Sequence, residues 1–194
     1  MSNQASKQMS NDANTVEALS SIVHEGHTIN SSLNMKFGQC RIRLDTNSAE
    51  LNQILESYFK AFLNEEGAAD IHVSALEMPE PDLGLDFTDW KRDPGKVGRK
   101  DSFVDLDDGR VCRKVRTGMQ YLLSDKECLV FGECIKNESQ VINFLISQYI
   151  TWLLHRGNVL CHAAALSIHG CLLYTSDAAD DFAVVLLSVG AGSF

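Results

Sequence analysis

The 194-residue sequence lacks several features that mark specialised classes of protein. No apolar run reaches the roughly 18 residues of a membrane span, and residues 1–12 lack the apolar stretch of a secretory signal. The six cysteines form no CxxC pair, which favours reduced, buried thiols over a disulfide framework or a zinc site. Lys and Arg number 17 against 26 Asp and Glu, and a net charge of −9 disfavours nucleic acid as a partner. These absences predict a cytoplasmic protein with no membrane span, no nucleic-acid partner and no metal site.

What the sequence does contain is a hydrophobic pattern that alternates between strand and helix spacing. Hydrophobic residues make up 44% of the chain, enough for a sizeable core. After a disordered start at 1–14, helical spacing predicts helices at residues 15–23, about 48–64 and 138–156. Period-2 alternation and turn signals predict a strand at 70–78 and antiparallel hairpins at 33–44, 102–115 and 118–132. The pattern indicates a mixed α/β fold.

Residues 79–100 interrupt this pattern with a long loop that holds all three prolines of the chain. A loop of this length inside a domain is typical of a functional or disordered segment. Phe87 and Trp90 are expected to hold it against the rest of the fold. One hypothesis follows directly: the chain is a non-catalytic α/β module that docks a partner through this loop.

Basic residues are concentrated in one part of the chain, since nine of the 17 Lys and Arg lie between residues 91 and 116. Such segregation suits a cradle for a phosphate group or an acidic substrate. A solvated face of a hairpin explains it equally well, and RNA binding is less favoured because few aromatic rings lie nearby. The candidate phosphate or substrate ligands are Lys96, Arg99, Lys100, Arg113, Lys114 and Arg116.

Three stretches carry a resemblance to a known family. They are PDLGLDFTDWKRDPGKVGRKDSFVDLDDGRVCRKVRTGM (81–119), QVINFLISQYITWLLHRG (140–157) and VLCHAAAL (159–166). Together they resemble the bacterial HPr-kinase-related proteins called HprK-related kinase B, over roughly residues 33–170. The resemblance implies an N-terminal α+β lobe with antiparallel hairpins (15–136). That lobe leads into the start of a P-loop core like that of HPr kinase and phosphoenolpyruvate carboxykinase (137–170).

The same resemblance implies an ATP-dependent kinase and one catalytic residue. His162 matches the histidine that precedes the phosphate loop in HPr kinases and is counted among their active-site residues. A histidine beside a phosphoryl group can donate a hydrogen bond or a proton. From the residues alone, a histidine on such an apolar strand fits a core position better. ATP and Mg²⁺ are implied as cofactors of the intact family member.

The phosphate loop that the family requires is missing, because the sequence contains no Gly-Lys-Ser or Gly-Lys-Thr. In its place, residues 171–181 read CLLYTSDAADD and resemble the translation of a transposase adapter used in preparing sequencing libraries. We therefore expect 171–194 to be a non-native tail on a truncated gene. Codons for 171–180 that differ from the adapter would refute this origin.

The leading interpretation is thus the N-terminal portion of a kinase related to HPr kinase. It would transfer a phosphoryl group from ATP to a hydroxyl of an unknown protein or small-molecule substrate, with the basic segment placing an acidic substrate. This chain alone is expected to be inactive and to bind no cofactor. An unfinished sheet would leave an open strand edge, so self-association into a homo-oligomer is also expected.

Overall fold

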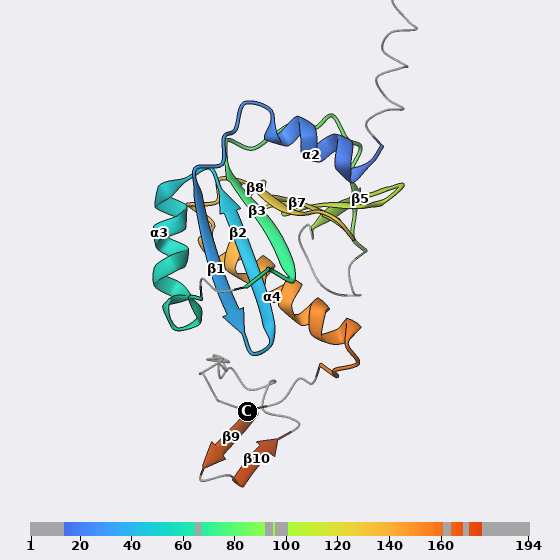
Figure 1. Cartoon of the computed structure of the whole chain (residues 1–194). Coiled ribbons are helices and arrows are strands. Elements are labelled where there is room, and N and C mark those ends of the chain that lie inside the picture. Colours follow the sequence, from blue (N-terminus) through green and yellow to red (C-terminus); the bar gives the residue numbers. More distant parts are fainter. Residues whose placement is uncertain are drawn as a thin grey trace, which may run out of the picture.

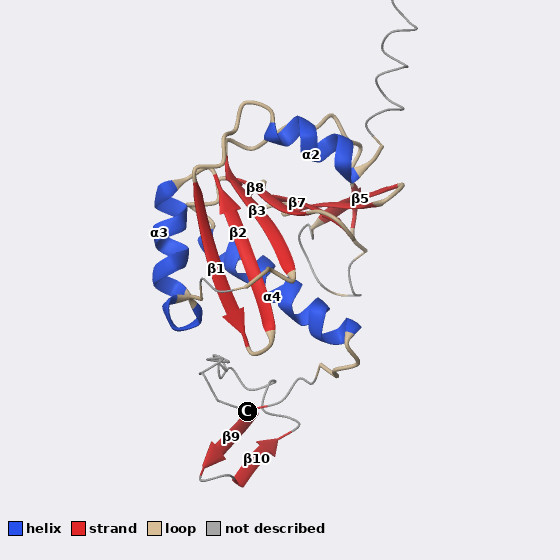
Figure 2. Cartoon of the chain, in the orientation of Figure 1, coloured by secondary structure: helices blue, strands red, loops and turns tan. Residues whose placement is uncertain are grey.

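The computed structural model describes residues 14–64, 67–91, 95, 101–160, 164–168 and 171–175, the last two ranges by their backbone alone. Within these ranges the chain is a mixed α/β protein, in which an eight-stranded sheet carries helices on both faces (Figures 1 and 2). The mixed α/β class predicted from the sequence is confirmed. None of the helices in these ranges has the length and apolar character needed to cross a membrane.

One side of the sheet is built from a hairpin and a parallel neighbour. Strands β1 (Ser31–Phe37) and β2 (Cys40–Thr46) form the hairpin predicted around Gly38, and their residues alternate between buried and partly exposed. Strand β3 (Ile71–Glu77) pairs with β2 in parallel. The crossover between them contains helix α3 (Ala49–Tyr58), as parallel neighbours require.

The other side of the sheet is an antiparallel meander. Its strands are β4 (Thr88–Asp89), β5 (Ser102–Leu106), β6 (Gly109–Arg113), β7 (Gln120–Ser124) and β8 (Cys128–Gly132). The two predicted hairpins here are confirmed as β5–β6 and β7–β8. Strand β8 also pairs with β3 in parallel, which joins the two sides in the order β1-β2-β3-β8-β7-β6-β5-β4.

Helix α3 differs from the prediction, because it ends at Tyr58 rather than near residue 64. Ser48 caps its start by accepting a hydrogen bond from the Leu51 N–H. A short 3₁₀ turn, η1 (Lys60–Phe62), follows and stacks the Phe62 ring on Phe37, with 4.7 Å between their centroids. The chain thus leaves the α-helix at Phe59, and the turn that follows places Phe62 against β1.

Hydrophobic residues form two clusters on opposite faces of the sheet. Helix α2 (Val16–His24) covers one face and packs on Leu76, Leu122, Leu129 and Phe131. On the other face, α3 and α4 (Glu138–His155) pack on β1, β2 and β3 (Figure 1). Because neighbouring residues of a strand point to opposite faces, Val130 lies in the second cluster while Leu129 and Phe131 lie in the first.

Helix α4 begins where the sequence resemblance places the start of a kinase core. Its buried residues belong to the same cluster as β1 and β2, so this helix helps to close the core of the eight-stranded sheet. Strands β9 (Ala164–Ile168) and β10 (Cys171–Thr175) form a separate antiparallel pair, the second of them within the predicted tail. The boundary at 137 and the HPr-kinase-like core stay predictions.

Candidate functional site

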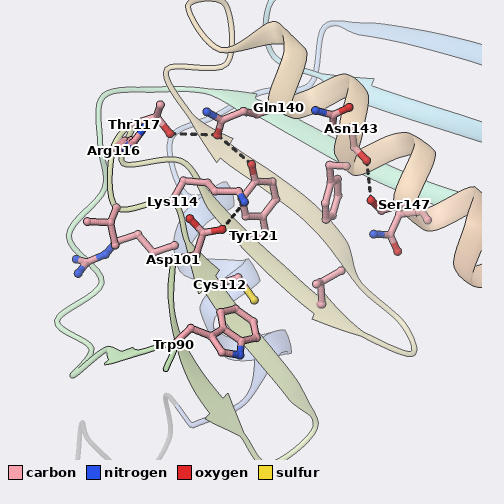
Figure 3. A pocket seen from close by; sticks show the side chains of 15 residues that line it. Trp90, Asp101, Cys112, Lys114, Arg116, Thr117, Tyr121, Gln140, Asn143 and Ser147 are labelled. Atoms are coloured by element: carbon pink, nitrogen blue, oxygen red, sulfur yellow. Dashed lines mark hydrogen bonds and ion pairs between the residues drawn. The ribbon is translucent and has the colours of Figure 1, made fainter. Parts of the chain in front are cut away.

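A groove of about 920 Å³ lies between α4 and the strands β6 and β7, with Trp90 and Asp101 at its border (Figure 3). Its floor comes from one face of these strands, on which the register aligns Cys112 with Tyr121. The Phe144 ring of α4 packs 5.1 Å from the ring of Tyr121 and forms one wall. The Trp90 ring packs 4.8 Å from Phe103 and forms the opposite wall. The groove is therefore apolar at its base.

The polar residues at one end of the groove are connected through Gln140, on the first turn of α4. Its Oε1 accepts hydrogen bonds from the Thr117 hydroxyl at 3.1 Å and from the Tyr121 hydroxyl at 3.2 Å. Burial raises the pKa of Tyr121, so its hydroxyl keeps the proton that it donates. Both hydroxyls are directed at the Gln140 oxygen, so neither contact uses its amide Nε2, which is a donor.

The loop between β6 and β7 brings two cations to this same end. Lys114 forms an ion pair with Asp101, the residue before β5. Arg116 is exposed and has no ion-pair partner in the part of the chain that the structure describes. Hydrogen bonds from the Thr117 and Gly118 N–H groups to the Lys114 carbonyl close the loop as a tight turn. The turn carries Arg116 next to Thr117, and the Thr117 hydroxyl bonds to Gln140 (Figure 3).

Arg113 faces the other way although it borders the groove. It precedes Lys114 directly, and adjacent residues of a strand point to opposite faces. Its guanidinium lies 4.3 Å from the centre of the Phe87 ring, which packs with the α2 cluster. The structure thus brings Lys114 and Arg116 together at the groove end and directs the guanidinium of Arg113 elsewhere.

The remaining residues proposed from the sequence are Lys96, Arg99, Lys100 and His162, which lie outside the described residues. No group of three or more His, Cys, Asp or Glu among the residues that are described could hold a metal ion. No local pattern indicated that Gln140, Thr117, Tyr121 and Trp90 lie in a common site. Each lies on a different element, and only the fold brings them together.

Four of the cysteines are described, and all four are free thiols, as predicted. Cys112 lies in the groove floor, where burial raises its pKa. Burial also raises the pKa of Cys40 and of Cys128 from 9.0 to about 11. These thiols are therefore packing groups that stay protonated at neutral pH, rather than nucleophiles.

The raised thiol pKa values predict a loss of stability in alkali. Unfolded thiols lose their protons near pH 9, whereas Cys40 and Cys128 in the folded chain keep theirs to about pH 11. Their contribution to stability is complete below pH 9 and falls as the pH rises toward 11. Urea unfolding at pH 7.5 and pH 10 measures this loss, and Cys128→Ala should reduce it. A stability that increases over this interval would contradict the assignment.

The described part of the chain is thus a mixed α/β protein with a groove that is apolar at its base and cationic at one end. Comparisons of the chain with models of protein families, with curated proteins and with solved structures found no match. The family resemblance of the three sequence stretches therefore stays a prediction.

Proposed function

We propose that the chain is part of an ATP-dependent kinase related to HPr kinase, and that the groove binds an acidic or phosphorylated part of its substrate. The observation that carries the substrate role is that Arg116, Gln140 and the ion-paired Lys114 all line this groove. Cationic and amide side chains along one groove suit an oxyanion. In such a kinase the contribution of this lobe would be positioning, which supplies much of the catalysis in phosphoryl transfer.

The residues present do not fit ATP and Mg²⁺, the cofactors implied for an intact member of the family. A phosphate loop binds phosphate through backbone N–H groups, a lysine and a hydroxyl, which a Gly-Lys-Ser/Thr sequence supplies. This chain contains no Gly-Lys-Ser/Thr sequence. No step that uses ATP is therefore assigned to its residues. The proposal assigns substrate binding to the described part and leaves phosphoryl transfer to a longer form of the protein.

The kinase proposal predicts a difference between two forms of the chain. The 194-residue chain should transfer no label from γ-labelled ATP to protein or small-molecule hydroxyls. A form in which the natural continuation of the gene replaces residues 171–194 should show transfer, and alanine at the lysine of its phosphate loop should abolish it. Turnover by the shorter chain, or a continuation without a Gly-Lys-Ser/Thr sequence, would refute the proposal.

A non-catalytic binding module is the second candidate, because the described part of the 79–100 loop is fixed to the sheet. The Gln120 amide donates a hydrogen bond of 2.7 Å to the Pro81 carbonyl. The Trp90 N–H donates one of 3.0 Å to the Asp101 carbonyl. A loop held in this way presents the Trp90 ring, 40% exposed, at the groove wall. A gene continuation that encodes a stop or an unrelated domain would favour this candidate.

A further inference from the structure

We propose that Arg113 is a conformational switch for the loop of residues 79–91, which carries the Trp90 wall of the groove. In the position that the structure shows, the Arg113 guanidinium packs on the Phe87 ring and holds the loop on the sheet. In a second position it turns to the buried Oε1 of Gln120 and releases Phe87. The switch sets how far the groove is open at Trp90, whichever ligand the groove binds.

Arg113 lies between two polar side chains on the α2 face of the sheet. The register places Arg113 of β6 directly opposite Ser102 of β5 on one side and Gln120 of β7 on the other. Gln120 is in turn opposite Phe131, which belongs to the α2 cluster, so the whole row points to that face. Opposed residues have Cβ atoms roughly 4.5–5.5 Å apart, which is within the reach of an arginine side chain.

Donors and acceptors are unmatched in this row. Ser102 has no exposed surface and Gln120 is 1% exposed. Neither the Ser102 hydroxyl nor the Gln120 Oε1 has a hydrogen-bond partner among the described residues. A buried oxygen without a donor costs free energy, because it has lost its bonds to water. The Arg113 guanidinium carries five N–H donors, yet its contact among the described residues is the Phe87 ring, 4.3 Å away. The donors that the buried oxygens lack are thus on the residue between them.

Gln120 holds its acceptor in a fixed place beside Arg113. The Gln120 Nε2 donates a hydrogen bond of 2.7 Å to the Pro81 carbonyl, which keeps the amide from turning. A bond from the guanidinium to Oε1 is charge-assisted, and so it is stronger than a bond between neutral groups. The contact with Phe87 is a cation–π interaction, which is of the same order of strength. Because Arg113 is partly exposed, its guanidinium can exchange between the two positions without leaving water entirely.

The release of Phe87 reaches the groove through β4. Phe87 directly precedes β4, a strand of two residues at the edge of the sheet that pairs with β5. Such a short strand forms few backbone hydrogen bonds, so it depends on side-chain contacts such as that of Phe87 to stay on β5. Trp90 directly follows β4, and its ring packs on Phe103. The α4 wall is fixed by the core, and a change at Arg113 therefore alters the groove at its Trp90 wall.

Acrylamide quenching of Trp90 fluorescence measures the opening on the full chain. Because the chain has two tryptophans, Trp152→Phe leaves Trp90 as the single indole, and Phe preserves a ring beneath Arg156. In this parent chain, Phe87→Leu keeps an apolar side chain but removes the ring that holds the guanidinium. Trp90 is 40% exposed in the position shown, so its quenching constant should rise about twofold on release.

Hydrogen exchange of the Arg113 Nε–H separates a switch from a simple loss of packing at Phe87. After Phe87→Leu the guanidinium bonds to Gln120, so this proton should exchange with water about tenfold more slowly than in the parent chain. Nuclear magnetic resonance of the protein with labelled arginine gives the rate. Loss of packing alone would leave the guanidinium in water and its exchange unchanged.

Two further variants complete the test. Arg113→Met has no donor for Gln120 but still packs on the Phe87 ring, so the Trp90 quenching constant should stay at or below the parent value. Lys126→Gln removes an exposed cation of the β7–β8 turn and should change neither readout. Circular dichroism checks that every variant folds. Unchanged Nε–H exchange in Phe87→Leu, or quenching that rises as much in Arg113→Met as in Phe87→Leu, would overturn the proposal.

Discussion

Replacing Phe131 by alanine is expected to lower the free energy of unfolding by about 3–5 kcal/mol. Phe131 has no exposed surface and lies on β8, the strand that joins the meander to β3. Its ring packs in the α2 cluster with Leu76 and Leu129. The cavity left by alanine would open at the junction of the two sides of the sheet, so we expect one cooperative transition at a lower urea midpoint.

The control for this prediction is Leu154→Ala, near the end of α4. Leu154 is 43% exposed, so truncating it removes little buried surface and should cost less than about 1 kcal/mol. Urea titrations of the wild type and both variants, followed by far-ultraviolet circular dichroism, give the comparison. Equal midpoints for Phe131→Ala and the wild type would mean that the packing of Phe131 on β8 does not stabilise the junction between the two sides of the sheet.

The sequence predicts the hairpins because their signals are local. Asp107-Asp108-Gly109 and the alternation on either side of it define β5 and β6 without reference to any other part of the chain. The parallel pair of β3 with β8 has no such signal, because the whole meander separates its two strands in sequence. Periodicity alone therefore could not place the hairpins in one sheet.

The site was predictable to a smaller extent than the fold. Charge clustering selected Lys114 and Arg116 as candidate ligands, and both line the groove. Alternation of extended chain separates Arg113 from Lys114, but it applies only once β6 is known to end at Arg113, directly before Lys114. The contact of Gln140 with Tyr121 depends on how α4 lies on the sheet, which is a tertiary property that local sequence does not encode.

Helix α4 connects the stability of the fold with the properties of the groove. Phe144 is 6% exposed and belongs to the core that α3 and β1 share, yet it also forms the groove wall beside Tyr121. Gln140, one turn earlier, anchors the polar end. Because one rigid element carries both contacts, the groove is formed before a ligand arrives, which reduces the entropy that binding must overcome.

The last prediction concerns Gly109, where β6 approaches β7 too closely for any side chain. A Cβ at this position would lie 2.1 Å from the Leu123 carbonyl oxygen and 2.8 Å from Cγ2 of Val16. The first neighbour is backbone, so Gly109→Ala must move a strand or break the pairing of Gly109 with Ser124. We expect the free energy of unfolding to fall by about 3 kcal/mol or more, which is at the upper end of the range for overpacked sites.

Gly84→Ala is the matched control, because it adds the same methyl group in open space. Gly84 has a φ of 64°, so alanine there costs about 1 kcal/mol for the left-handed backbone alone. Urea unfolding measures how far each variant lowers the free energy of unfolding. Hydrogen exchange shows which strands lose protection. Gly109→Ala should speed exchange of the β6 and β7 amides, and Gly84→Ala should leave them protected. Equal losses with unchanged exchange in both variants would show that β6 and β7 are not in this close register.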